Sequence, residues 1–106
     1  MKPTMIRQGD VLLIPVLKRD MRLARTAIEP ENGRVILAYG EATGHHHSLS
    51  AKVANLTERD GKRYLRVLAD SPLEHQEHDP ILVPKGTYLV VRQVEYAPEA
   101  IRNVQD

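Results

Sequence analysis

The sequence predicts an all-β fold, mainly antiparallel, that forms a small barrel or sandwich. Short runs of β-branched and aliphatic residues separated by turn residues recur along the chain. No segment longer than about ten residues keeps a helical period. The dipeptide Asp60-Gly61 between two such runs is typical of a tight hairpin. The 106 residues suffice for one modest hydrophobic core, so we expect a single domain over residues 1–106.

The N-terminal half is predicted to hold two strands and a long connection. Residues 10–16, DVLLIPV, form an apolar run in which Pro15 indicates a sheet edge or a strand end, because proline cannot donate to the ladder. Residues 34–39 form the second strand. Between them, residues 17–32 carry a weak helical pattern that Pro30 interrupts. This predicts one long irregular loop with a short helix of a turn or two.

The C-terminal half is predicted to consist of strands and tight turns. The first of its strands alternates apolar and polar residues, which indicates one solvated face. The next returns from the turn at Asp60-Gly61, and the last two are joined by Pro84-Lys85-Gly86. The four strands are expected over residues 47–56, 62–69, 81–83 and 87–96.

Composition excludes several classes of function. Fifteen Lys and Arg against fourteen Asp and Glu give a net charge of +1, so no global charge attracts nucleic acid or an acidic membrane. The absence of cysteine excludes thiolate metal sites, disulfides and a cysteine nucleophile. The N-terminal residues are too polar for a signal peptide, and no run approaches the roughly 18 apolar residues of a membrane span. We therefore expect a cytoplasmic protein.

All five histidines fall into two short clusters, which are the main indication of chemistry. The first is His45, His46 and His47 within GEATGHHHSL, and the second is His75 and His78 within LEHQEHDP. In an extended segment, residues two apart share a face. We therefore expect His45 and His47 to converge on one ion, while His46 points to the other side.

The spacing of the second cluster suits a tight turn or one turn of helix, not a flat strand. Such a turn, packed against the first cluster, would complete a site for a divalent ion with four ligands: His45, His47, His75 and His78. Glu77 would orient a ligand, bind the ion or move a proton, and Glu41 is a further oxygen nearby. Zinc, nickel, iron, manganese and copper all stay open.

Two kinds of metal site are consistent with this ligand set. If one coordination position stays open, bound water becomes acidic enough for a metal-dependent hydrolase, and an oxygenase is the other enzymatic alternative. If four imidazoles close the shell, the site is structural. A metal-free site is also open, in which a histidine paired with Glu77 or Glu41 acts as a general base. Asp10 is interpreted as a turn residue, and Arg92 as a cross-strand partner outside the site.

Two alternatives come from other classes of function. A non-enzymatic binding or assembly module would use short strand edges to pair with a protein partner or with another copy of the chain. A nucleic-acid role would require a set of arginines to gather on one face. That set is Arg19, Arg22, Arg25, Arg63 and Arg66. Phe and Trp are absent, which argues against a base-stacking platform.

The segments RQGDVLL, GEATGHHHSL, LEHQEHDPILVPKGTY and RQVEYAPEAIRNV together resemble a family of small uncharacterised proteins from bacterial and phage genomes. The resemblance spans most of the chain and centres on the patterns T-G-H-x-H and H-x-E-H-x-P. They map onto Thr43, Gly44, His45 and His47, and onto His75, Glu77, His78 and Pro80. The resemblance favours His45 and His47 over His46 as site residues, and it implies no particular activity.

A looser likeness is to the cupins, small β-barrels that hold a metal with an H-x-H pair, a carboxylate and a later histidine beside a P-x-G turn. Pro84-Lys85-Gly86 provides such a turn here. In cupins the last ligand follows that turn, whereas no histidine follows it in this chain. The likeness is therefore an analogy of fold and metal chemistry only.

Overall fold

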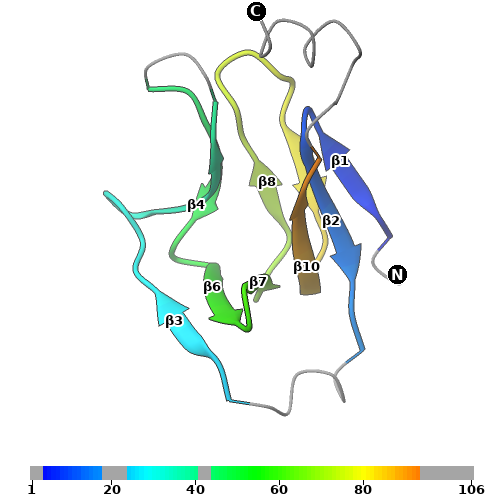
Figure 1. Ribbon diagram of the computed structural model, residues 1–106. Coiled ribbons are helices and arrows are strands. Elements are labelled where there is room, and N and C mark those ends of the chain that lie inside the picture. Colours follow the sequence, from blue (N-terminus) through cyan, green and yellow to red (C-terminus); the bar gives the residue numbers. More distant parts are fainter. Residues whose placement is uncertain (1–3, 18–23, 41–43, 94–106) are drawn as a thin grey trace, which may run out of the picture.

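Every regular element that the structure describes is a β-strand (Figure 1). The structure is a computed structural model that describes residues 4–17, 24–40 and 44–93. These residues contain no helix, and hence none of the length and apolar character needed to cross a membrane. The predicted all-β class is confirmed. Residues 18–23, where the short helix was expected in part, lie outside the described residues.

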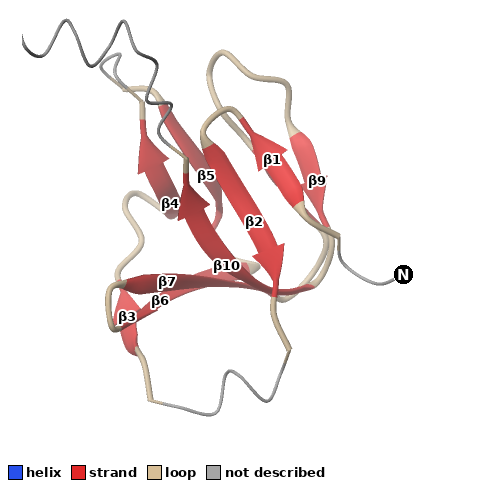
Figure 2. Cartoon of the chain, turned by 45° about the vertical axis from the view of Figure 1, so that its right-hand side comes forward, coloured by secondary structure: helices blue, strands red, loops and turns tan. Residues whose placement is uncertain are grey.

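Six strands form the main sheet, in which each neighbouring pair is antiparallel. Their order is β1 (Ile6–Gln8), β2 (Val11–Pro15), β10 (Gly86–Arg92), β7 (Lys62–Val67), β6 (Ala54–Arg59) and β3 (Thr26–Ile28). Figure 2 shows β6 and β7 crossing beneath the ends of the other strands. Of the two predicted architectures, barrel or sandwich, a closed barrel is not formed, because closure requires the two outermost strands to pair. Here β1 pairs with β2, and β3 pairs with β6 at the opposite edge.

Two shorter ladders complete the fold. The first joins β4 (Arg34–Tyr39) to β5 (His46–Ser50), and the second joins β8 (Ser71–Leu73) to β9 (Ile81–Val83). Reciprocal backbone hydrogen bonds between Ser48 and Glu74, of 3.0 and 2.9 Å, connect β5 to the residue that follows β8. The two ladders therefore lie side by side, and this connection brings the two histidine clusters to the same end of the molecule.

Inward-facing residues of all three sheets form one hydrophobic core. Its fully buried side chains include Leu13, Leu37, Leu49, Leu56, Leu65, Leu73, Val83 and Tyr88. The hydroxyl of Tyr88 donates a hydrogen bond of 2.6 Å to the carbonyl of Pro84, so the polar end of this buried ring is satisfied. The buried side chain of Tyr88 thus connects β10 to the turn that precedes it.

The strand predictions are confirmed where the local signal is strong. The second predicted strand coincides with β4, and β6 and β7 form the predicted hairpin. Asp60 and Gly61 have the positive φ angles, 51° and 76°, that this turn requires. The predicted strand over residues 47–56 is in fact two strands, β5 and β6, separated by a turn at residues 51–53.

Three short strands were not predicted, namely β1, β3 and β8. Each has three residues, too few for alternation to be recognised. β3 lies within the segment expected to be an irregular loop, where pairing with β6 stabilises an extended backbone. The predicted last strand ends at Arg92, and the residues from 94 onward lie outside the described residues.

Candidate functional site

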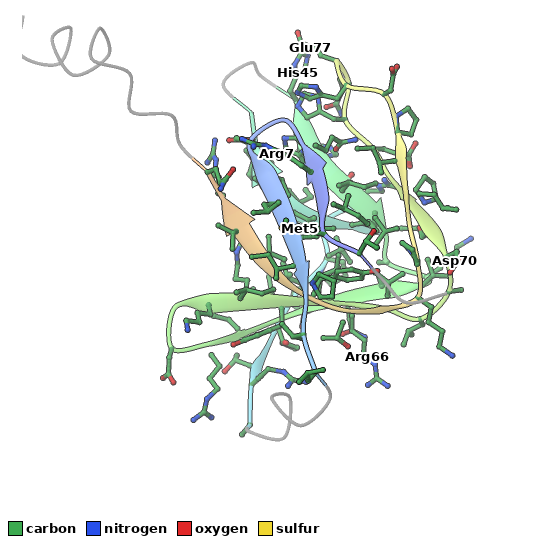
Figure 3. The ribbon with its side chains drawn as sticks, turned by 90° about the vertical axis from the view of Figure 1, so that its right-hand side faces the viewer. Met5, Arg7, His45, Arg66, Asp70 and Glu77 are labelled. Carbon is green, nitrogen blue, oxygen red and sulfur yellow. The ribbon has the colours of Figure 1, made fainter. Side chains whose placement is uncertain are left out.

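A pocket of about 420 Å³ opens at the end of the molecule where His45 and Glu77 lie (Figure 3). Three segments contribute most of it: the turn between β1 and β2, the residues at the start of β5, and the loop between β8 and β9. Its lining residues are Asp10, Gly40, His45, His47, His75, Glu77, His78 and Arg92. All four histidines that the sequence singled out, together with Glu77, therefore line one pocket, which we call the histidine pocket.

The four imidazole rings form one contiguous cluster, in which the ring of His75 contacts each of the other three. The ring centroid of His75 lies 4.4 Å from that of His47, 4.7 Å from that of His78 and 5.8 Å from that of His45. The rings of His47 and His78 are stacked at 5.8 Å. The expectation that the two clusters meet is confirmed, although their roles as metal ligands stay a prediction.

His46 lies on the other side of the strand, as the alternation predicted. It lines a separate pocket beside Arg34 and Gln76, and its ring contacts Tyr39 edge-on at 6.2 Å. Its backbone N–H donates to the side-chain oxygen of Gln76. His46 thus belongs to the same sequence run but not to the histidine pocket.

A buried glutamine fixes the orientation of His47. The side-chain NH₂ of Gln8 donates to the carbonyls of Leu73 and Asp79, at 2.9 and 3.0 Å. Because both of its donors are used on carbonyls, the amide oxygen of Gln8 must be the atom that faces His47 Nδ1, at 2.9 Å. A carbonyl oxygen only accepts, so Nδ1 of His47 carries a hydrogen. In the neutral ring, Nε2 is then the atom with the lone pair.

Asp10 faces that lone pair. Its Oδ1 lies 3.2 Å from Nε2 of His47, and its Oδ2 accepts a hydrogen bond of 2.8 Å from Nε of Arg92. Arg92 also donates to the carbonyl of Tyr39, which ties β10 to the end of β4. Although burial alone would raise the pKa of Asp10, the hydrogen bond and charge of Arg92 lower it below its ordinary value. Asp10 is therefore a carboxylate at neutral pH.

The environment of His47 and His75 disfavours their protonated forms. Burial, followed by the charge of His75, lowers the pKa of His47, against an opposing effect of Asp10. Burial is also the largest cause of the lowered pKa of His75, followed by the charge of His78. Several imidazoles in one pocket cannot all carry a proton without mutual repulsion. For His47 and His75, the lowered pKa values favour the neutral ring, which is the form that binds metals.

The rim of the pocket is less constrained. Nδ1 of His75 accepts the backbone N–H of Glu77 at 3.0 Å, so its neutral ring carries the hydrogen on Nε2. The carboxylate of Glu77 is 68% exposed and lies 3.6 Å from Nδ1 of His45. As the side chains stand in the structure, no three His, Asp or Glu residues among those described converge closely enough to hold a metal ion, so metal binding requires the imidazole rings to reorient. The inner histidine is oriented for a ligand, whereas His75 would have to give up a hydrogen bond.

Two glycines let the backbone approach the rings closely. Gly9 has a φ of +56°, and a Cβ there would lie 2.7 Å from Nε2 of His78 and 3.3 Å from Cε1 of His47. A Cβ on Gly40 would lie 3.3 Å from Cβ of His45 and 3.6 Å from Nε2 of His75. A side chain at position 9 would therefore displace the ring of His78, whereas one at position 40 would only crowd His45.

Three residues of the site were missed or assigned other roles from the sequence: Gln8, Asp10 and Arg92. A signal existed for Gln8, because it shares the inward face of β1 with Ile6, and a polar residue there requires buried partners. Asp10 and Arg92 carried no comparable signal. A turn residue and a strand arginine are common on any β-sheet surface.

The arginines of the nucleic-acid alternative do not gather as that alternative required. Arg63 points inward and donates to the carbonyl of Leu37, whereas Arg66 is exposed. Only Arg25 and Arg66 line a common pocket among the described arginines of that set. Arg19 and Arg22 lie outside the described residues.

Comparison with known proteins places the chain among uncharacterised sequences. A family model described as "Domain of unknown function (DUF8820)" matches residues 7–93. No curated protein and no solved structure matches. The match includes both histidine clusters, Gln8, Asp10 and Arg92, and it provides neither an activity nor a ligand.

Proposed function

We propose that this chain, which belongs to the DUF8820 family, binds a divalent metal ion in the histidine pocket. One observation carries the proposal. The hydrogen bonds of Gln8 orient His47 so that Nε2 faces the Asp10 carboxylate at 3.2 Å. In metalloproteins, a ligating histidine commonly donates its other ring N–H to an oxygen acceptor in the same way.

The contact between His47 and Asp10 requires a positive charge. If His47 is neutral, its Nε2 lone pair faces a carboxylate oxygen, and two acceptors at this separation repel each other. Either a proton on Nε2 or a cation shared by the two atoms removes the repulsion. Burial and the neighbouring histidines lower the pKa of His47, which disfavours the proton. A metal ion is therefore the better solution near neutral pH.

The remaining imidazoles provide the rest of a ligand set. His78 stacks on His47, and His45 lies toward the rim beside Glu77. His75 would join only by releasing the backbone N–H of Glu77, so we expect it to contribute least to metal affinity. A set of imidazole nitrogens with one carboxylate suits zinc, nickel, iron or manganese.

An exposed rim would leave room for substrate or water at the ion. Metal-bound water is acidic enough to act as a nucleophile near neutral pH, which suits hydrolysis. Glu77, exposed and 3.6 Å from His45, is in a position to move a proton at the rim. We therefore propose a metal-dependent hydrolase as the leading enzymatic role, with an oxygenase as the alternative if the bound metal is iron.

The test is a titration of chelator-stripped protein with Co²⁺ and Zn²⁺, followed by elemental analysis. We expect near-stoichiometric binding to the wild type, loss of at least a hundredfold in affinity for His47→Ala, and little change for His46→Ala. His46→Ala is the matched control, because it removes an adjacent imidazole from outside the pocket. Equal affinity in the wild type and His47→Ala would contradict the proposal.

Nuclear magnetic resonance of the imidazole nitrogens separates the two explanations of the His47–Asp10 contact. In metal-free protein near pH 7, we expect His47 to be neutral with its hydrogen on Nδ1, and Nε2 to shift when Zn²⁺ is added. An imidazolium at pH 7 that is insensitive to Zn²⁺ would favour a metal-free ion pair instead. That outcome would contradict the assignment of His47 as a metal ligand, because a protonated Nε2 has no lone pair to donate.

A further inference from the structure

A second pocket, of about 440 Å³, lies at the end of the molecule opposite to the histidine pocket. Figure 3 shows Arg66 at that end, far from His45 and Glu77. Its lining residues are Arg25, Arg66, Val67, Leu68, Lys85, Gly86 and Thr87. Three of the seven are cations and none is an acid. We call it the basic pocket.

The three cations come from three separate parts of the chain. Arg66 lies on β7 directly opposite Thr87 of β10, so their side chains are neighbours on one face of the sheet. Lys85 lies in the turn before β10, and Arg25 directly precedes β3. Tertiary structure, and not a local run of basic residues, therefore gathers these charges around one concavity.

Contacts with the rest of the fold hold Arg25 and the backbone of Lys85 in position. The backbone N–H of Lys85 donates to Asp70 Oδ1 at 2.8 Å, which fixes the turn. Nε of Arg25 donates to the hydroxyl of Thr57 at 3.0 Å, and its guanidinium lies 5.9 Å from the centre of the Tyr64 ring. Asp70 lies behind the turn and offsets part of the positive charge, but it does not line the pocket. Of the three cations, the guanidinium of Arg25 is thus held in place before a ligand arrives.

We infer that the basic pocket binds the phosphate groups of a small phosphorylated ligand. Two guanidinium groups and an ammonium group, with the hydroxyl of Thr87, are suitable donors for phosphate oxygens. The volume of about 440 Å³ exceeds that of a single phosphate, so a ligand with more than one phosphate group fits. The inference is independent of metal binding, because the two pockets share no residue.

The test is calorimetric titration of the full chain with inorganic pyrophosphate, after chelator has removed any metal that could itself bind the anion. We expect saturable binding to the wild type that weakens about fivefold or more in Arg66→Gln and in Lys85→Gln. Lys62→Gln is the matched control, because it removes an exposed cation from the same strand and should change affinity less than about twofold. Thermal unfolding confirms that each variant is folded.

Three results would overturn the inference. The first is no saturable binding of pyrophosphate to the folded wild type at millimolar concentration. The second is an equal loss of affinity in Lys62→Gln, which would indicate diffuse attraction to surface charge. The third is a single-stranded oligonucleotide that binds more tightly than pyrophosphate and loses affinity in the same pocket variants, which would make nucleic acid the ligand. A shift of the Thr87 amide resonance on pyrophosphate addition would support the pocket as the site.

Discussion

The histidine pocket and the basic pocket lie at opposite ends of the molecule and are built on different principles (Figure 3). In the histidine pocket, the side chain of His47 is 3% exposed and depends on the buried amide of Gln8. In the basic pocket, Arg66 is exposed and depends only on strand register. A buried polar network therefore couples ligand binding to the stability of the fold. On an exposed charged face, a substitution can change ligand affinity with little change in stability.

Replacement of Gln8 by leucine should lower stability more than any other substitution considered below. A small loss would mean that the buried network does not couple metal binding to stability. The substitution removes the Gln8 donors from the carbonyls of Leu73 and Asp79, and it leaves the Nδ1 hydrogen of the buried His47 without its acceptor. We expect the free energy of unfolding to fall by about 2 to 4 kcal/mol. Urea denaturation measures it, and metal affinity should fall about ten- to a hundredfold.

Gln76→Leu is the control for that experiment. Gln76 is exposed, and its side-chain oxygen accepts one backbone N–H, from His46. We expect a loss below about 1 kcal/mol and unchanged metal affinity. If the two glutamine variants lost similar stability, the Gln8 network would not be the feature that holds the histidine pocket.

Substitution of Gly9 by alanine should come next. A φ of +56° strains any residue with a Cβ, and the new methyl group would also meet Nε2 of His78 at 2.7 Å. We expect a loss of about 1 to 2 kcal/mol in stability from the backbone conformation. Displacement of the His78 ring should in addition lower metal affinity, as measured by titration with Co²⁺.

Gly33→Ala separates the two effects of that substitution. Gly33 has a φ of +75°, but a Cβ there would meet nothing within 4 Å. It should therefore show a similar loss of stability and no change in metal affinity. A loss of metal affinity in both variants would mean that strain, and not the space around His78, controls the site.

Acid should destabilise the metal-free protein through its histidine pocket. The pKa of His47 is lowered below its ordinary value of 6.5 in the folded state, chiefly by burial, so the unfolded chain takes up a proton first. Its contribution to stability is complete above pH 6.5 and is lost as the pH falls toward the folded-state pKa. One proton limits the slope to about 1.4 kcal/mol per pH unit.

Urea denaturation between pH 7.5 and about 5 measures this slope. His47→Gln should flatten it, because glutamine does not titrate, whereas His46→Gln should leave it unchanged. A slope that is equally steep in both variants would mean that other groups, such as His75, whose pKa is lowered chiefly by burial, carry the dependence.

Arg92→Gln should lower stability least, and it tests whether the two pockets act independently. The Arg92–Asp10 pair is partly exposed, with side chains 46% and 36% accessible, so we expect less than about 1 kcal/mol of lost stability. Without Arg92, the Asp10 carboxylate is less firmly oriented, and metal affinity should fall severalfold. Arg66→Gln, at the other end, should leave metal affinity unchanged. A loss in both would indicate a long-range charge effect.

Local patterns were sufficient for the longer elements of the fold. β4 and the β6–β7 hairpin could be predicted because a run of β-branched and aliphatic residues and the Asp60-Gly61 turn act within a few residues. β3 could not be predicted, because its three residues form a strand only through hydrogen bonding to β6. The division of the predicted strand at residues 51–53 was also missed, since the alternation of apolar residues continues across that turn.

The all-β class, the presence of His45 and His47 in one pocket and the separation of His46 could be predicted from local patterns, because they follow from the two-residue period of an extended backbone. Only the tertiary structure decided that Gln8 orients His47, that Asp10 and Arg92 join the pocket, and that Arg25, Arg66 and Lys85 surround another. The side chains that form each pocket come from segments that are far apart in the chain. Their proximity depends on the order and register of the strands, which local patterns do not specify.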